Sequence, residues 1–299
     1  MDACVITCAI SGVAANRAQC PAIPYTPEEY ATEARRAHDA GAAVLHIHAR
    51  YPDGRPSYRV DEYRAITEAI LAEVPEIVVN YSTGAVGVPM EERVHHITAL
   101  KPELGALNMG SMNYAKYSSK RKEMVFDLVF SNPFSDITFL LERMNSAEVK
   151  PELECFDTGH IGNAFPLIDM GLLTVPIQFS LILGVLGGAP PRSETLGHMA
   201  SLLPEPNTWE VIAISREQWK LVAAAASLGG NVRVGLEDNF YTPTGEMASS
   251  NGDLVDAAAR LVELSGRSVA DPAEARRLLS LPDPPDRSAF EPVEQDASG

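Results

Sequence analysis

Short apolar runs alternate with segments of helical periodicity along most of the chain. The apolar runs predict eight strands, and the segments between them place apolar residues on one face at a 3.6-residue period. The strands are expected at residues 4–9, 44–50, 77–81, 104–109, 153–156, 177–183, 210–214 and 232–236. This alternation is typical of a closed (β/α)8 barrel, although an open doubly wound sheet would give a similar pattern.

Capping residues mark where one of the helices begins. Thr26, with Pro27 after it and Glu29 three positions on, forms a capping box that opens a helix ending near Gly41. Further helices are expected near residues 61–73, 90–100, 135–145, 162–170, 194–203, 217–228, 254–264 and 272–279. Residues 114–133 are polar and basic without such a pattern, so we expect an irregular loop there, lying over the site.

Chain length and a missing phosphate-binding motif favour the closed barrel. The 299 residues, 45% of them hydrophobic, suffice for the core of one large barrel. No Gly-x-Gly-x-x-Gly motif follows the first strand, which counts against an open, dinucleotide-binding sheet. We therefore predict an α/β protein with a single (β/α)8 TIM barrel over residues 1–281. The proline-rich, acidic residues 282–299 are expected to form an extended or disordered tail.

Charge and cysteine usage narrow the choice of partners and compartment. Forty acidic residues against 24 basic ones give a formal net charge of −16, which argues against a nucleic-acid partner. No apolar run of about 18 residues occurs, so no membrane partner is expected, and residues 1–4 lack the basic start of a signal peptide. Four cysteines without CxxC spacing suit a reducing compartment, and we expect a cytoplasmic protein.

Two histidines at the end of the second predicted strand are the first candidates for chemistry. His46 and His48 share one face of this strand because side chains alternate along it. They precede a turn at Asp53-Gly54 and thus lie at the carboxyl end of the strand, where α/β folds carry their sites. One interpretation is that both are core histidines with satisfied nitrogens; the other is that the pair binds a metal ion.

An acidic residue near the other end of the chain completes a candidate ligand set. Barrel closure makes the last strand a neighbour of the first, which places Glu237 two strands from His46 and His48 at the same rim. Two imidazoles and a carboxylate that leave one coordination position of the metal open are typical of catalytic zinc. The same three ligands also bind iron, manganese, cobalt or nickel. The alternative is that Glu237 is a solvated loop acid.

Further polar residues are expected at the same rim. Arg233 and Glu237 share parity, so both would face the barrel axis, and a buried guanidinium needs a partner, for which Asp238 is nearest. Such a pair would hold the carboxylate of Asp238 ionised and directed as a base, whereas a surface salt bridge is the alternative. Ser82-Thr83-Gly84, after the third strand, offers hydroxyls and amides that suit an anion.

Several longer motifs run in order from the first strand to the last. They are Ala9-Ile10-Ser11-Gly12, His46-Ile47-His48-Ala49-Arg50, Asp53-Gly54-Arg55-Pro56-Ser57, Ser82-Thr83-Gly84, Lys101-Pro102-Glu103, Leu107-Asn108-Met109-Gly110, Pro151-Glu152-Leu153-Glu154, Gln178-Phe179, Leu183-Gly184-Val185 and Val232-Arg233-Val234-Gly235-Leu236-Glu237-Asp238-Asn239. With these motifs the chain resembles the β-keto acid cleavage enzymes, typified by 3-keto-5-aminohexanoate cleavage enzyme. A match of this length is specific.

The resemblance implies a (β/α)8 barrel, usually a homotetramer, that condenses a β-keto acid with acetyl-CoA and releases acetoacetate and a new acyl-CoA. It implies that His46, His48 and Glu237 bind Zn2+, which the carboxylate and 3-oxo group of the keto acid chelate. It also implies that Asp238, oriented by Arg233, takes a proton from the methyl group of acetyl-CoA.

Substrate contacts are implied by the same resemblance. Ser82 would hold the substrate carboxylate, Thr83 and Asn108 would belong to the substrate site, and Glu154 would line the pocket. Two positions depart from the aminohexanoate enzymes, because Ala14 replaces a glutamate and Ala106 replaces a threonine. An ammonium group would lose its counter-charge, so we expect the accepted side chain to be neutral or anionic.

Two rival functions remain open from the sequence. Another metal-dependent barrel enzyme, a hydrolase or a retro-aldol lyase, could use the same three ligands to activate water or an enolate. Dependence on acetyl-CoA separates this rival from a β-keto acid cleavage enzyme. A catalytically inactive barrel serving as a binding or regulatory module is disfavoured because every expected ligand is present, and metal content decides that question.

Overall fold

A computed structural model describes residues 2–281 of the chain; the expectation for the tail, residues 282–299, lies outside the described residues. Eight parallel strands close into a barrel, in the order β10-β11-β2-β3-β4-β5-β8-β9. The strands are β2 (Ile6–Ala9), β3 (Val44–Ile47), β4 (Val78–Tyr81), β5 (Leu104–Asn108), β8 (Lys150–Cys155), β9 (Ile177–Leu183), β10 (Asn207–Ala213) and β11 (Asn231–Val234). The predicted (β/α)8 TIM barrel is confirmed.

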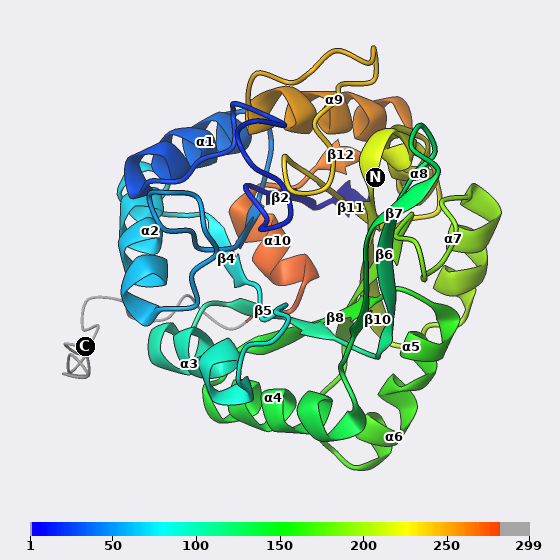
Figure 1. The fold of residues 1–299 in the computed structure, drawn as a ribbon. Helices are drawn as coiled ribbons and strands as arrows, with labels where there is room; N and C mark the ends of the chain where they lie inside the picture. Colours follow the sequence, from blue (N-terminus) through cyan, green and yellow to red (C-terminus); the bar gives the residue numbers. More distant parts are fainter. Residues whose placement is uncertain (1, 282–299) are drawn as a thin grey trace.

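Helices surround the barrel because each buries one apolar stripe against the outward face of the strands (Figure 1). They are α1 (Pro27–Asp39), α2 (Val60–Glu73), α3 (Met90–Leu100), α4 (Phe134–Ser146), α5 (Thr158–Gly162), α6 (Ala164–Asp169), α7 (Ser193–Ser201), α8 (Gln218–Ser227) and α9 (Asn251–Leu264), with a 3-10 turn, η1 (Ser215–Glu217), before α8. A further helix, α10 (Pro272–Leu278), lies at one end of the barrel instead. The predicted capping box of Thr26 and Glu29 opens α1. Within residues 2–281, no helix has the length and apolar character that crossing a bilayer requires.

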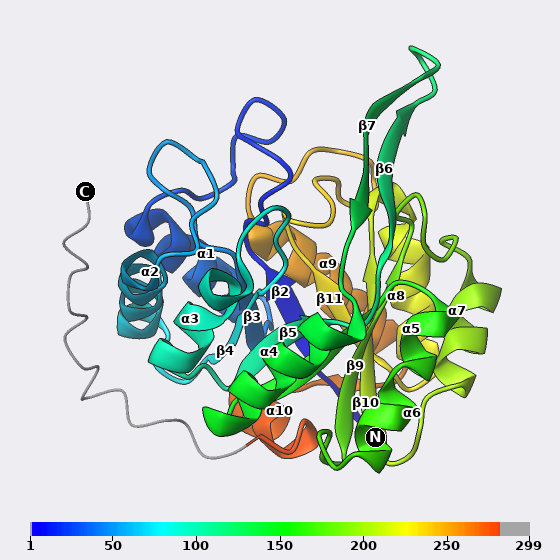
Figure 2. The same ribbon diagram turned by 60° about the horizontal axis from the view of Figure 1, so that its bottom comes forward.

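The amino-terminal end of the barrel is closed by the end of the described chain. β1 (Ala3–Cys4) pairs in parallel with β12 (Ser268–Val269), and α10 lies across this end of the barrel (Figures 1 and 2). An apolar cluster joins α10 to the first residues of the strands; it contains Ala3, Val5, Ala43, Val44, Val78, Leu104, Ala270, Ala275 and Leu279. With this end filled by apolar side chains, the opposite, carboxyl end is the one open to ligands.

The largest difference from the predicted elements is a β-hairpin in place of the irregular loop at residues 114–133. β6 (Met112–Ser118) and β7 (Glu123–Phe130) pair in antiparallel and project from the carboxyl end of the barrel (Figure 2). Basic residues gather toward its tip, which masked the apolar, β-branched residues of β7 in the sequence. Two smaller corrections are that the first predicted strand is split into β1 and β2, and that the helix expected at residues 162–170 is divided into α5 and α6.

Candidate active site

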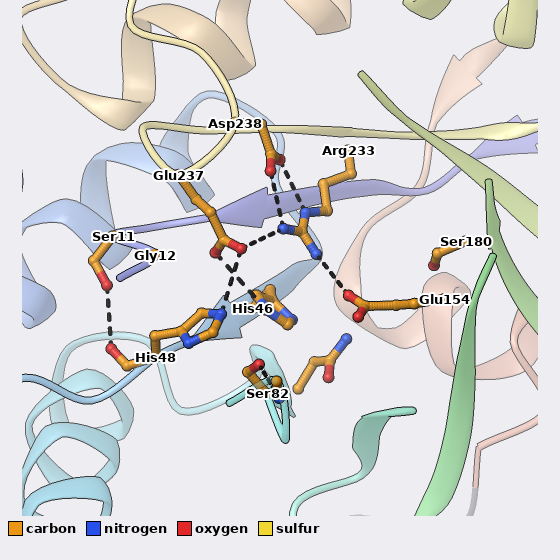
Figure 3. Close-up of polar contacts among 12 residues, drawn as sticks. Ser11, Gly12, His46, His48, Ser82, Glu154, Ser180, Arg233, Glu237 and Asp238 are labelled. Carbon is orange, nitrogen blue, oxygen red and sulfur yellow. Dashed lines mark hydrogen bonds and ion pairs between the residues drawn. The ribbon is translucent and has the colours of Figure 1, made fainter. Parts of the chain in front are cut away.

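The three expected metal ligands converge at the carboxyl rim of the barrel (Figure 3). His46 lies on β3 and His48 just after it, whereas Glu237 follows β11, two strands away through β2. Nε2 of His46 lies 3.8 Å from Glu237 Oε2, and Nε2 of His48 lies 3.4 Å from Glu237 Oε1. One ligand atom from each side chain falls within 4.8 Å of the other two. The backbone therefore brings two nitrogens and a carboxylate together from opposite ends of the sequence.

Two glycines allow the last strand to approach this closely. Gly12 adopts a φ of +54°, and a Cβ there would lie 2.5 Å from Glu237 Cγ. Gly235 adopts a φ of +139°, and a Cβ there would lie 2.2 Å from the carbonyl oxygen of Ala9. Both positions combine a left-handed conformation with a contact that excludes any larger residue. They fix where Glu237 stands against the two histidines.

The donor set fits a divalent ion. Within the described part of the chain, His46 Nε2 and Glu237 Oε2 are buried and have no hydrogen-bond partner. Burying polar atoms in this way is costly unless something else satisfies them. Burial and the Arg233 cation hold the pKa of His46 well below its usual range, so its ring is neutral, the form that binds metals. Burial alone would raise the pKa of Glu237, but Arg233 and the two imidazoles hold it well below its usual range.

Arg233 holds Asp238 beside the candidate metal ligands. Its Nε donates to Asp238 Oδ2 at 3.0 Å, and its Nη2 donates to Asp238 Oδ1 at 3.1 Å and to Glu237 Oε1 at 2.8 Å. A bidentate guanidinium fixes both the position and the plane of a carboxylate. Burial raises the pKa of Asp238 to about 6 against the opposing effect of Arg233, so the carboxylate is ionised at neutral pH. The expected pairing of Arg233 with Asp238 is confirmed.

Glu154 and Asn108 lie on the opposite side of this group. They are register partners on β8 and β5, and both are nearly inaccessible to solvent. Glu154 Oε1 lies 3.6 Å from Arg233 Nη1, too far for a hydrogen bond, and burial raises the pKa of Glu154 to about 8. The carboxyl group is therefore protonated at neutral pH despite the nearby cation. Oδ1 of Asn108 is buried and, among residues 2–281, has no partner.

The Ser82-Thr83-Gly84 segment follows β4 at the same rim. The backbone N–H of Gly84 donates to Ser82 Oγ at 3.0 Å, and His96 Nε2 lies 2.8 Å from the carbonyl oxygen of Ser82. The hydroxyl of Thr83 donates to the carbonyl oxygen of Ala106 at 2.6 Å. Ser82 thus stands among the site residues in Figure 3, whereas the Thr83 hydroxyl is engaged with backbone.

Arg50 is a structural support that its position on the histidine strand did not reveal. It is 2% exposed, and its guanidinium donates to the carbonyl oxygens of Ser11, Gly12, Ala15 and Gly54. These bonds hold the loop that contains Gly12 against the histidine strand. The sequence did show that Arg50 lies on the same face of the strand as His46 and His48. A cation buried on that face must find hydrogen-bond acceptors.

The base of the hairpin adds an apolar wall to the carboxyl end of the barrel. Met112 and Phe130 pack with Phe156, Ile182 and Ile212, the last two being inward residues of β9 and β10. The candidate metal ligands and the Arg233 cluster lie on the remaining strands. The barrel mouth therefore has one charged side and one apolar side.

The chain is thus a TIM barrel whose carboxyl rim carries a buried Arg-Asp pair and a His/His/Glu group that could hold a metal ion. The chain belongs to the beta-keto acid cleavage enzyme family, whose sequence profile matches residues 3–281. The expected resemblance is confirmed.

Two characterised relatives are similar over nearly their whole length. The 3-keto-5-aminohexanoate cleavage enzyme of Fusobacterium nucleatum subsp. nucleatum is 38% identical over 282 residues, which cover 94% of this chain and 99% of that protein. The 3-dehydrocarnitine:acetyl-CoA trimethylamine transferase of Rhizobium meliloti is 35% identical, covering 92% of this chain and 96% of that protein. By their names, these relatives act on a β-keto acid, and the second does so with acetyl-CoA.

A solved structure supports the fold alone. The apo structure of ObcA superposes with a TM-score of 0.70 at 19% sequence identity. The match covers 87% of this chain, and this chain spans 66% of the length of ObcA. The two proteins therefore share the barrel fold at low sequence identity.

Proposed function

We propose that the protein is a zinc-dependent β-keto acid cleavage enzyme. It would condense a β-keto acid with acetyl-CoA and release acetoacetate and a new acyl-CoA. The observation that carries the proposal is the convergence of His46, His48 and Glu237 beside the Arg233-held carboxylate of Asp238. The acetyl-CoA named for the R. meliloti relative supports the choice of co-substrate.

His46, His48 and Glu237 would hold the ion, and their two nitrogens and one oxygen favour zinc over calcium or magnesium. When bound, the ion supplies Lewis-acid polarisation of the 3-oxo group of the keto acid. The chain's own contribution is to keep the imidazole of His46 neutral and to keep the carboxylate of Glu237 ionised in a buried position. Arg233 does the latter through its bond to Glu237 Oε1.

Asp238 would act as the base. Atom balance decides which proton it removes, because the methyl group of acetyl-CoA becomes the methyl group of acetoacetate. The proton must therefore leave C2 of the keto acid, between carboxylate and ketone, which revises the expectation that it leaves acetyl-CoA. C2 would then bond to the thioester carbonyl carbon while the C–S bond of acetyl-CoA breaks and releases the CoA thiolate. The thiolate would bond to C3 and the C2–C3 bond would break, which gives the new acyl-CoA. The carbon that was C2 would take back the proton from Asp238, which gives acetoacetate. A base with a pKa just below neutrality suits this proton transfer.

The remaining site residues would bind and orient the substrate. Ser82 would donate its hydroxyl hydrogen to the substrate carboxylate, next to the neutral carboxyl group of Glu154 and the free amide oxygen of Asn108. Thr83 would contribute indirectly, because its hydroxyl ties the Ser82 segment to β5. Keeping Glu154 neutral avoids a second negative charge beside an anionic substrate.

The side chain of the accepted keto acid would be neutral or anionic. The family resemblance placed an acidic and a hydroxyl residue where this chain has Ala14 and Ala106. Ala106 is fully buried on β5, so neither alanine offers an ammonium group a partner. The apolar wall at the base of the hairpin supports a side chain without positive charge.

The protein would work as a homotetramer in the cytoplasm, as the family resemblance implies. The hairpin exposes Tyr117, Met124, Val125 and Val129 by 45% to 64%. Apolar side chains on a projecting two-stranded ribbon support burial against a second copy of the chain. The hairpin also carries four basic residues, which complement the acidic remainder of a partner. The four free cysteines support a reducing compartment.

A panel of β-keto acids with acetyl-CoA, followed by acetoacetate release, tests the proposal. We expect turnover that requires acetyl-CoA and is greater for an uncharged side chain than for its aminated analogue. With trideuterated acetyl-CoA, the acetoacetate should keep all of the methyl deuterium. Cleavage without acetyl-CoA would instead identify the rival lyase or hydrolase, and loss of methyl deuterium would contradict the assigned proton.

A further inference from the structure

Beneath the candidate metal ligands, five polar side chains form a connected row across the barrel interior. None of the five is more than 2% exposed, and the proposed function gives none of them a role; they are Thr7, Asn80, Glu152, Ser180 and Glu210. They come from five strands, β2, β4, β8, β9 and β10. Buried polar groups of this number need a physical explanation, because each costs free energy unless it is fully bonded.

The geometry around Ser180 favours one proton shared between the two acids of the row, Glu152 and Glu210. Ser180 Oγ lies 2.8 Å from Glu152 Oε1 and 3.1 Å from Glu210 Oε1. A hydroxyl has one hydrogen, so it can donate to only one of these oxygens. The other contact is a hydrogen bond only if that carboxyl group carries a proton and donates to Ser180. Burial raises the pKa of Glu152 and raises that of Glu210 to about 8, in agreement with one neutral acid.

Because the shared proton lies between an acid and Ser180, the second carboxyl oxygen of each acid, Oε2, can accept a hydrogen bond. Whichever acid carries it, the proton lies on the oxygen that faces Ser180. Glu210 Oε2 accepts from the Thr7 hydroxyl at 2.7 Å, and Glu152 Oε2 accepts from Nδ2 of Asn80. The amide of Asn80 is therefore oriented, with its NH2 group toward Glu152 and its oxygen turned away from it.

Asn80 is the register partner of His46 on the neighbouring strand. In the described part of the protein, Oδ1 of Asn80 and Nδ1 of His46 are both buried without a hydrogen-bond partner. They are complementary, because an amide oxygen accepts and an imidazole N–H donates. The other ring nitrogen of His46, Nε2, faces Glu237.

We propose that Asn80, oriented by the acid pair, is a positioning residue that holds the hydrogen of His46 on Nδ1 and leaves the lone pair of Nε2 free for the metal ion. This inference rests on the proposed metal site. A ligating histidine donates its second ring nitrogen to an outer partner, and loss of such a partner lowers metal affinity by about 10-fold to 100-fold. The acid pair acts only through Asn80.

A matched pair of variants tests the proposal. Asn80→Leu and Thr7→Val each replace a buried polar side chain of the same row by an apolar one of similar size. Asn80→Leu should lower the affinity for Zn2+ or Co2+ about 10-fold to 100-fold, measured by chelator competition on folded protein, whereas Thr7→Val should leave it unchanged. Asn80→Asp keeps an acceptor toward His46 and should bind the metal more tightly than Asn80→Leu does.

The tautomer of His46 is a readout that does not depend on metal binding. Long-range 1H–15N correlation spectra of metal-free protein labelled at histidine should show the hydrogen on Nδ1 in the wild type and on Nε2 in a substantial fraction of Asn80→Leu. A wild-type hydrogen on Nε2, or equal metal affinities for Asn80→Leu and Thr7→Val, would overturn the proposal. A wild type that binds no divalent ion but keeps the Nδ1 hydrogen would refute the metal site and leave the positioning by Asn80 standing.

Discussion

The rim with the candidate metal ligands and the hairpin stand at the same end of the barrel, and they are held in different ways. At the rim, neighbouring strands hold His46, Glu237 and Arg233. Two glycines allow the close approach that places Glu237 against the histidines. The hairpin rises from the mouth as a two-stranded ribbon, and four of its apolar side chains, those of Tyr117, Met124, Val125 and Val129, are exposed. A site that must hold reacting atoms at fixed distances belongs on the rigid element, and a surface that meets a partner can project.

Removing the base should give the largest effect on the rim side of this comparison. Asp238→Asn keeps the shape of the side chain and one oxygen for Arg233 but cannot accept the C2 proton. We expect kcat/KM for acetoacetate formation to fall about 10³-fold, the usual scale for a general base. The metal content should be unchanged. Loss of less than tenfold would show that another group takes the proton.

Crowding the rim should weaken metal binding by displacing Glu237. Gly12→Ala places a methyl group 2.5 Å from Glu237 Cγ, whereas Gly87→Ala has the same kind of positive φ, +73°, with nothing described within 4 Å. Both variants should lose about 1 kcal/mol of stability from backbone strain. Only Gly12→Ala should lose metal affinity, by about tenfold or more in chelator competition. Equal affinities in the two variants would contradict the close-packing argument.

A smaller effect is expected from Glu154 and appears as a pH dependence. Its pKa of about 8 means that it is neutral below pH 8 and gains a negative charge above it. Activity should fall as pH rises through about 8, because the new charge repels an anionic substrate. Glu154→Gln should remove this alkaline limb while keeping most of the activity at pH 7. An unchanged alkaline limb in the variant would assign it to another group.

Charges placed on the hairpin should alter the assembly of the protein and have the smallest effect on the barrel. Val125→Glu with Val129→Glu places two charges on the exposed outer face of β7 and should shift the protein toward monomers in analytical ultracentrifugation. Leu264→Glu, at a side chain that is 84% exposed on α9, is the matched control and should leave assembly unchanged. The melting temperature of the barrel should change little, because neither valine is buried. A wild type that sediments as a monomer would contradict the assigned role.

The sequence predicted the rim well and the hairpin poorly, for physical reasons. Alternation along a strand placed His46 and His48 on one face, and barrel closure brought Glu237 beside them; both rest on regular geometry. The pairing of Arg233 with Asp238 followed from the cost of burying an unpaired cation. No such rule predicts the hairpin, because the sequence of its basic tip and exposed residues is like that of a solvated loop.

The interior row of polar residues was also beyond prediction, although its signals were visible. Asn80 interrupts an apolar strand, and Glu152 and Glu154 alternate on another, so inward-facing polar side chains could be suspected. Which of them meet depends on the stagger of the strands around the barrel, which no local pattern encodes. The link between Glu152 and Glu210 through the hydroxyl of Ser180 is of this kind.

Metal content per chain tests the central claim most directly. Protein purified without chelators should contain one divalent ion per chain by inductively coupled plasma mass spectrometry. A folded His46→Ala/His48→Ala variant should contain none. A metal-free wild type that takes up no ion from added Zn2+, or a double variant that keeps the wild-type content, would contradict the account.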